Sequence, residues 1–175
     1  MYKLCKFIRY IAIIELRKTF LILLLLFPLI TFSQKVITGK VVSITDGDTF
    51  KLLTQDSVQI KVRLANIDCP EKKQAYSTKA KEFTSKAIFG KNVTLMTLKK
   101  DRYGRTIANV IYNDSLNLIQ ELLKQGLAWH YLEYSNDPLL QKLEDQAKKE
   151  KIGLWHDEAP IPPWKWRNTK KKKTK

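Results

Sequence analysis

The sequence predicts a small α+β domain in which five β-strands form a barrel and three helices lie at its ends. Two observations predict this fold. Three strand-like segments follow one another between residues 36 and 64, with only short turns between them. One segment of helical period comes after the third strand, and two come after the fifth. Five strands with helices in these positions indicate an OB-type barrel, a common scaffold for nucleic-acid binding.

The five strands are predicted from β-branched residues and from alternation of apolar and polar residues. Residues 58–64 alternate most regularly, with Val62 and Leu64 on one face and Lys61 and Arg63 on the other. Arg63 is therefore expected on the face that points away from the apolar core. The other predicted strands are residues 36–44, 49–53, 93–98 and 107–112.

The three helices are predicted from apolar residues at helical spacing and from their boundary residues. Over residues 74–89 apolar residues recur every three or four positions, and Gly90 supplies the stop. A short helix is expected over residues 118–125. The third helix begins with Asp137 as its N-cap and Pro138 at its first position.

The N-terminal segment has the composition of a leader. Residues 1–19 carry five Lys or Arg residues, and residues 20–32 are apolar and uncharged. The apolar run suits a signal peptide and is shorter than a bilayer span. We expect a signal peptide over residues 1–33, cleaved after Ser33, and a protein that is secreted or held in the cell envelope. The alternative is an uncleaved anchor.

The chain is strongly basic, with a net charge of +15. Residues 1–33 hold five of the 32 Lys and Arg residues and one of the 17 Asp and Glu residues. Five more lysines lie in residues 170–175, which leaves +6 for residues 34–169. This charge favours a polyanionic partner, which is nucleic acid or an acidic membrane surface.

The rest of the chain is expected to form one domain and a tail. The domain covers residues 34–157. The tail, residues 158–175, is rich in Pro, Trp and Lys. We expect the chain to be extended from Asp157 onward, with the lysines of residues 170–175 disordered.

The two cysteines limit the chemistry. Cys5 lies in the leader, so Cys69 is the single thiol of the mature chain. One cysteine with His130 and His156 cannot build a usual structural zinc site. Acidic neighbours disfavour a Cys69 thiolate, so we expect no nucleophilic thiol.

Acidic residues lie where predicted strands run into turns. Asp48 follows the first strand, and Asp68 and Glu71 follow the third, with Pro70 between them. Proline favours an extended Cys69, which turns the Cys69 carbonyl outward beside the Asp68 carboxylate. Two carboxylates and a carbonyl form an all-oxygen site for a hard cation such as Ca²⁺. Each motif alone also occurs as an ordinary turn or helix start.

Four short motifs stand in order along the chain. They are Asp46-Gly47-Asp48-Thr49, Arg63-Leu64, Ile67-Asp68-Cys69-Pro70-Glu71 and Asp101-Arg102-Tyr103-Gly104-Arg105. Together they resemble the motif series of the thermonuclease (micrococcal nuclease-like) family. The resemblance covers residues 36–167, and residues 161–167 resemble tails found on some members.

This resemblance implies an OB-fold barrel with three helices and a calcium-dependent phosphodiesterase that cleaves DNA and RNA and leaves 3′-phosphate ends. Asp48 and Asp68 would be calcium ligands. Cys69 would contribute only its carbonyl, at a position where the family usually has threonine.

The resemblance also implies catalytic and substrate-binding residues. Glu71 matches the proposed general base, and Arg63 and Arg105 match the two phosphate-binding arginines. Tyr103 and Tyr131 match aromatic residues near the bound nucleotide. We expect a monomer without an obligate protein partner, in contact with a membrane only if the leader is uncleaved. The first alternative is a non-catalytic nucleic-acid-binding OB module of the cell envelope, which the complete set of catalytic side chains disfavours. The second is an envelope structural protein, which leaves the four motifs unexplained.

Overall fold

The computed structural model describes residues 13, 15–18, 20 and 35–173. The chain divides into two units, Met1–Ser33 and Gln34–Lys175. Apart from Phe20, the predicted apolar leader segment and its cleavage site lie outside the described residues, as does Cys5. Within the described part of the chain, no helix has the length and apolar character to cross a membrane.

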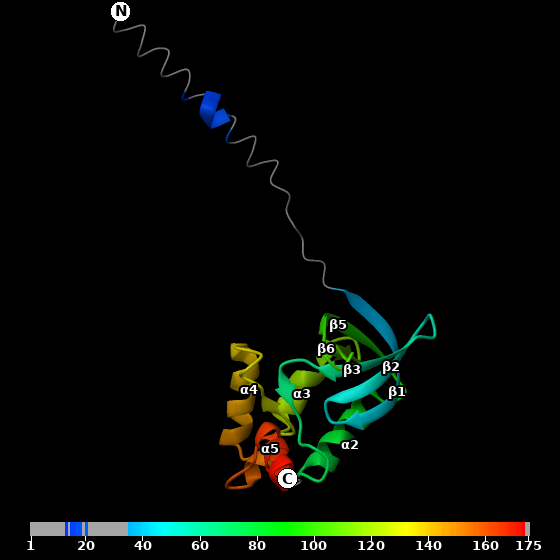
Figure 1. Cartoon of the computed structure of the whole chain (residues 1–175), viewed down its shortest axis with the longest axis vertical. Coiled ribbons are helices and arrows are strands. Elements are labelled where there is room, and N and C mark those ends of the chain that lie inside the picture. Colours follow the sequence, from blue (N-terminus) through cyan, green and yellow to red (C-terminus); the bar gives the residue numbers. More distant parts are fainter. Residues whose placement is uncertain (1–12, 14, 19, 21–34, 174–175) are drawn as a thin grey trace, which may run out of the picture. The chain divides into compact units, whose positions relative to one another are not determined.

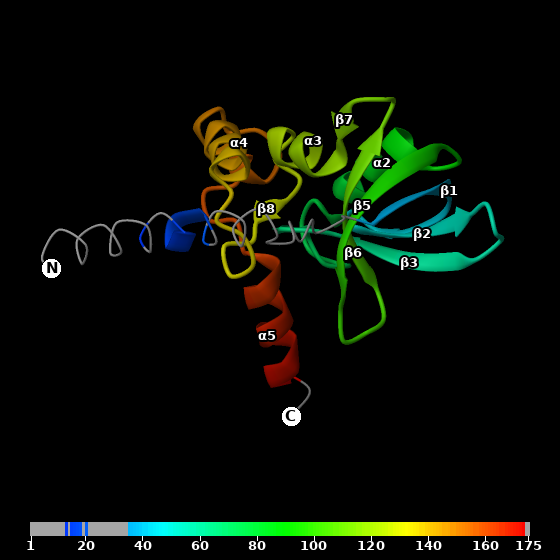
Figure 2. The same ribbon diagram turned by 90° about the horizontal axis from the view of Figure 1, so that it is seen from above.

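Five strands of the second unit close into a barrel (Figure 2). The antiparallel neighbours of β1 (Val36–Asp46) are β2 (Thr49–Thr54) and β5 (Asn92–Lys100). β3 (Gln59–Leu64) is antiparallel to β2, and β6 (Thr106–Tyr112) is antiparallel to β5. The barrel closes because β3 also pairs with β6, in parallel. The predicted five-stranded barrel is confirmed.

Three short strands lie outside the barrel wall. β7 (Leu116–Asn117) pairs with the end of β6. β4 (Ile67–Asp68) follows β3 and pairs with β8 (Trp129–His130), so that Asp68 lies opposite Trp129. This small second sheet fixes the backbone that carries Asp68.

The three predicted helices are present as α2 (Ser77–Ile88), α3 (Leu118–Lys124) and α4 (Pro138–Lys149). Asp137 caps α4 as predicted, because its side chain accepts a hydrogen bond from the Leu139 N–H at 2.9 Å. α4 lies beside α3 in both views (Figures 1 and 2).

The prediction of an extended tail is wrong. After the short 3-10 helix η1 (Gly153–His156), the chain forms a further helix, α5 (Pro163–Lys173). A proline at the first position of a helix loses no hydrogen bond and has a suitable φ angle, so Pro163 begins α5 rather than preventing it. Figure 2 shows α5 projecting from the domain.

The core fills the barrel and continues beneath α2 and α3. Val62 and Leu64 of β3 are buried, as the predicted alternation requires, and Lys61 is exposed. Other fully buried core residues are Val41, Phe50, Leu52, Ala80, Leu95, Val110, Leu118 and Leu122. The core thus holds the ends of β2, β3 and β4 close together, and the acidic motifs lie at those ends.

Candidate active site

Arg63 bridges the two carboxylates that were predicted to bind metal. Thr49 pairs with Arg63 between β2 and β3, and the Leu64 N–H donates to the Asp48 carbonyl at 2.8 Å. Arg63 Nη1 lies 2.5 Å from Asp48 Oδ2, and Nη2 lies 2.8 Å from Asp68 Oδ1. Although Arg63 points away from the apolar core, only 14% of its side chain is exposed, because these acids cover it. One guanidinium therefore holds both carboxylates at the strand ends.

The turn that carries Asp48 is packed tightly against α2. A Cβ atom at Gly47 would lie 2.8 Å from the Ala80 Cβ and 3.0 Å from the Cys69 Sγ. Thr84 donates its hydroxyl hydrogen to the Gly47 carbonyl at 2.6 Å. Glycine is therefore needed at position 47 because α2 approaches the turn so closely.

Cys69 joins the two acidic motifs through its backbone. Its N–H donates to Asp48 Oδ2 at 2.9 Å. Burial, reinforced by Asp48, raises the pKa of the Cys69 thiol well above its usual value. The thiol therefore stays protonated near neutral pH, which agrees with the expectation that it is not a nucleophile.

Burial dominates the electrostatics of the acidic groups. It raises the pKa of Asp68, against the opposing effect of Arg167 and Arg63. Burial and the charge of Asp48 also raise the pKa of Asp46. Burial acts to lower the pKa of Arg63, but Asp48 and Asp68 raise it, so the guanidinium stays charged. The charged forms of these acids depend on the neighbouring cations.

Glu71 lies at the edge of this cluster and is bound by a residue that the sequence analysis did not select. Arg167 Nη1 lies 2.6 Å from Glu71 Oε1, and Arg167 Nη2 lies 2.8 Å from Asp68 Oδ2. The Glu71 N–H donates to Gln74 Oε1 at 2.9 Å. Arg167 belongs to α5. Arg167 lies within residues 161–167, which resemble tails found on some family members, and this resemblance was the signal that could have identified it. Because the tail was expected to be extended, no contact with the acidic residues was predicted for Arg167.

Arg105 and Tyr103 belong to the hairpin between β5 and β6, not to the strand ends that carry the carboxylate cluster. Arg105 Nε donates to Asp101 Oδ2 at 2.7 Å, and Asp101 Oδ1 accepts from the N–H groups of Tyr103 and Arg105. Tyr103 is 68% exposed, and its ring centroid lies 5.5 Å from the Arg105 guanidinium. The hairpin therefore holds Tyr103 and Arg105 side by side, and Arg105 is paired with Asp101 of the same hairpin.

Tyr131 lies beside the second sheet and is covered by α5. Its N–H donates to the Asn66 carbonyl at 2.9 Å. Its ring stacks on Trp164, with centroids 4.9 Å apart and an angle of 3° between the planes. Burial and the hydrogen bond to Glu133 raise the pKa of Tyr131 to about 12. The ring face that was predicted to contact a nucleotide thus stacks on a tryptophan.

The donor atoms suit a hard cation. Asp48 and Asp68 are buried carboxylates that share one positive group, and the third predicted ligand is the Cys69 carbonyl. Oxygen donors with two negative charges fit Ca²⁺ and do not suit zinc. Among the residues that the structure describes, no group of three or more His, Cys, Asp or Glu side chains is arranged to hold a metal. Water would therefore complete the coordination of any bound cation.

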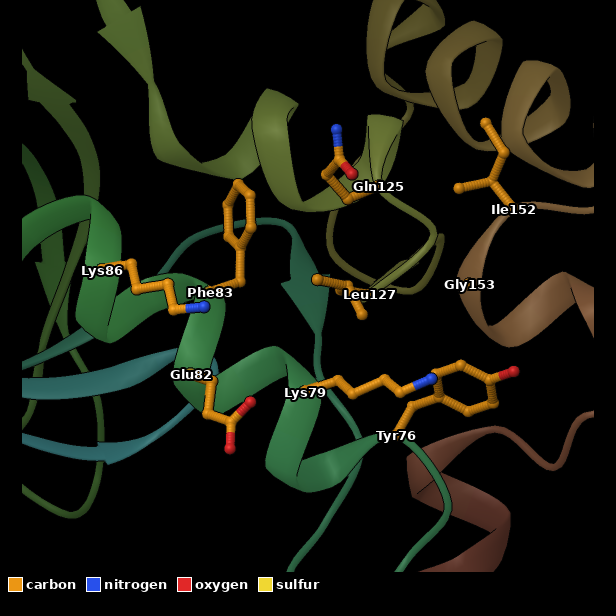
Figure 3. Close-up of a pocket in the computed structure, with 9 residues that line it drawn as sticks. All are labelled: Tyr76, Lys79, Glu82, Phe83, Lys86, Gln125, Leu127, Ile152 and Gly153. Atoms are coloured by element: carbon orange, nitrogen blue, oxygen red, sulfur yellow. The ribbon is translucent and has the colours of Figure 1, made fainter.

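A pocket of about 360 Å³ lies elsewhere, between α2 and the loops that follow α3 and α4 (Figure 3). Its lining residues are Tyr76, Lys79, Glu82, Phe83, Lys86, Gln125, Leu127, Ile152 and Gly153. None of them is a predicted catalytic or metal-binding residue, so the pocket is separate from the carboxylate cluster.

Comparison with known proteins identifies relatives over most of the chain. A family model described as "Staphylococcal nuclease homologue" matches residues 61–157, more than half of the sequence. An "Uncharacterized endonuclease" of Haemophilus influenzae is 45% identical over 150 residues, which cover 85% of this chain and 84% of the relative. The "Micrococcal nuclease" of Shigella flexneri is 35% identical over 147 residues, which cover 78% of this chain and 83% of the relative. The chain belongs to the family of staphylococcal nuclease homologues.

Proposed function

We propose that this protein is an exported, Ca²⁺-dependent nuclease that hydrolyses phosphodiester bonds of DNA and RNA and leaves 3′-phosphate ends. The observation that carries the proposal is the carboxylate cluster, with its arginines, at the ends of β2, β3 and β4. There Arg63 bridges Asp48 and Asp68, and Arg167 links Asp68 to Glu71. Family membership supports a nuclease function, and the relatives named as endonucleases support cleavage at internal positions of a nucleic-acid strand.

Each of the proposed catalytic side chains has a distinct role. Arg63 stays protonated, and its planar guanidinium suits two phosphate oxygens and the extra charge of the transition state. To bind them it exchanges part of its contacts with Asp48 and Asp68. Glu71 is 37% exposed, so water can reach its carboxylate and give up a proton to it. Arg105 reaches the phosphate from the hairpin after leaving Asp101.

Calcium is proposed on the chemistry of the donor atoms. Asp48, Asp68 and the Cys69 carbonyl would hold the ion, which supplies positive charge at a phosphoryl oxygen when bound. In this reading Cys69 acts only through its backbone. Threonine in place of Cys69, as in the usual family pattern, would leave that carbonyl in the ligand set.

The remaining parts of the proposal concern the ends of the chain and its partners. We propose that residues 1–33 direct export and that residues 34–157 form the nuclease domain, with residues 158–175 as an attached segment. The mature protein is secreted or held in the cell envelope and acts as a monomer on nucleic acid. The basic composition of the chain supports a nucleic-acid substrate.

Digestion of labelled DNA and RNA by residues 34–175 tests this function. We expect cutting of both substrates in Ca²⁺, loss of cutting in chelator, and fragments that polynucleotide kinase must dephosphorylate before they can be extended. We expect Arg63→Ala to lose cutting, and its matched control is Lys61→Ala, which removes an exposed cation from the same strand. Binding without cutting by folded, Ca²⁺-supplied protein would instead support the non-catalytic binding module.

A further inference from the structure

The C-terminal helix adds a second guanidinium to the carboxylate cluster. Arg167 lies 99 positions after Asp68 in the chain, yet it contacts both Asp68 and Glu71. Its Nη1 also lies 3.4 Å from Asp68 Oδ1. Arg167 thus links the candidate base, Glu71, to a candidate metal ligand, Asp68.

Two other contacts fix the start of α5 beside the site. Gln74 Nε2 donates to the Ile161 carbonyl at 2.5 Å, and the same Gln74 side chain accepts from the Glu71 N–H. One turn before Arg167, the Trp164 ring stacks on Tyr131. The segment that carries Arg167 is thus attached to the backbone of Glu71 and to the aromatic ring predicted to contact substrate.

The charge of the cluster shows what Arg167 contributes. Asp48, Asp68 and Glu71 bring three negative charges, and Arg63 brings one positive charge, so these four residues leave an excess of two negative charges. Arg167 halves that excess. A phosphodiester is an anion, so compensation beside Glu71 lowers the electrostatic cost of its approach.

Arg167 also differs from Arg63 in access. Its side chain is 39% exposed, whereas that of Arg63 is 14% exposed. A guanidinium that donates to two carboxylates from its two terminal nitrogens can donate to two phosphate oxygens instead. Arg167 is therefore the more accessible of the two guanidinium groups to a polyanion in solution.

We propose that Arg167 is a phosphate-binding residue of this active site, delivered by α5. It exchanges part of its contact with Asp68 and Glu71 for a phosphate of the nucleic-acid chain. The Trp164–Tyr131 stack and the Gln74–Ile161 hydrogen bond hold the helix in position for this exchange. The role of Arg167 in cleavage rests on the proposed nuclease function, but its role in binding phosphate does not.

Two assays on residues 34–175 test the proposal. Fluorescence anisotropy in chelator measures the affinity for a labelled single-stranded oligonucleotide at several salt concentrations, and initial rates in Ca²⁺ measure kcat/KM. Arg167→Ala is compared with Lys165→Ala, which removes an equal charge from an exposed position of the same helix.

We expect Arg167→Ala to weaken DNA binding and to reduce the salt slope by about 0.7, the value for one lost phosphate contact to a single strand. We expect kcat/KM to fall on the order of 10- to 100-fold, because a charge-stabilising donor is lost. Arg167→Lys should recover part of both losses, and Lys165→Ala should change each by less than about twofold.

Three outcomes would overturn the inference. Faster cleavage or tighter binding by Arg167→Ala would mean that α5 blocks the site. Unchanged binding and cleavage would mean that the ion pairs are only structural, and an equal loss in Lys165→Ala would mean that general charge is responsible. Circular dichroism melting checks folding, and Arg167→Gln replaces the alanine variant if the latter unfolds.

Failure of the nuclease proposal can be told apart from failure of this inference. If wild type binds DNA through Arg167 but does not cut in Ca²⁺, the proposed function fails and the phosphate contact remains. If wild type cuts and the Arg167 variants equal it in both assays, the inference alone fails.

Discussion

The two predicted phosphate-binding arginines occupy opposite kinds of environment. Arg63 lies at the meeting point of β2, β3 and β4, where 14% of its side chain is exposed, and is held by two acids from different motifs. Arg105 lies in a hairpin, and its partner Asp101 is only four residues away. Fixing Arg63 therefore requires the whole barrel, whereas Arg105 is fixed by one turn. Arg63 should contribute to both stability and activity, and Arg105 to activity alone.

Replacing Arg63 should have the largest effect. Arg63→Ala leaves Asp48 and Asp68 buried beside each other without their shared cation. We expect the free energy of unfolding to fall by about 3 kcal/mol and cleavage to fall on the order of 10²- to 10³-fold. Urea denaturation and initial rates measure the two effects. Lys61→Ala is the control, and an equal loss of stability in that variant would contradict the account.

Replacing Arg105 should separate activity from stability. Arg105→Ala is expected to reduce cleavage on the order of 10²-fold or more. Its pair with Asp101 is partly exposed and local, so the free energy of unfolding should change by less than about 1 kcal/mol. The measurements are the same as for Arg63. A large loss of stability would show that the hairpin is not an independent element.

Replacing Gly47 tests how tightly the turn that carries Asp48 is packed. In Gly47→Ala the new methyl group would meet Ala80 and the Cys69 thiol, so we expect a loss of about 1–3 kcal/mol. Thermal unfolding followed by circular dichroism measures it. Gly104→Ala, in the hairpin, is a useful contrast because its Cβ would meet nothing within 4 Å, although its φ of +75° still adds strain. A smaller loss at Gly47 than at Gly104 would contradict tight packing of this turn.

Replacing the thiol should have the smallest effect. The pKa of Cys69 is raised by burial, so the thiol is protonated and takes no part as a nucleophile. We expect Cys69→Ser to retain cleavage within about threefold at every pH between 6 and 9, because the backbone groups are unchanged. A collapse of activity in a folded Cys69→Ser protein would contradict this role.

Most of the barrel could be predicted because its signals are local. Alternation around Val62 and Leu64 indicated β3, and Asp137 followed by Pro138 indicated the start of α4. The sequence motifs also brought attention to Asp48 and Asp68, which do share one cation. Each strand, helix start and motif is read from residues within a few positions of one another, and the order of the motifs along the chain links Asp48 to Asp68.

The contribution of α5 could not be predicted in this way. Consecutive prolines and a run of lysines normally indicate an extended, solvated segment, so a helix was not predicted here, although Pro163 suits a first helical position as Pro138 does. The contacts of Arg167 with Asp68 and Glu71 span nearly a hundred residues and depend on how the tail folds back. Spacing in the sequence says nothing about such a contact.

The most direct test of the central claim is the rate of DNA cleavage by Glu71→Gln beside Glu82→Gln, in residues 34–175 with Ca²⁺. Glu82 is an exposed glutamate on α2 and serves as the matched control. We expect a loss on the order of 10²-fold or more for Glu71→Gln and an unchanged rate for Glu82→Gln, with both proteins folded. Equal, undiminished cleavage by both variants would contradict a catalytic site built around Glu71.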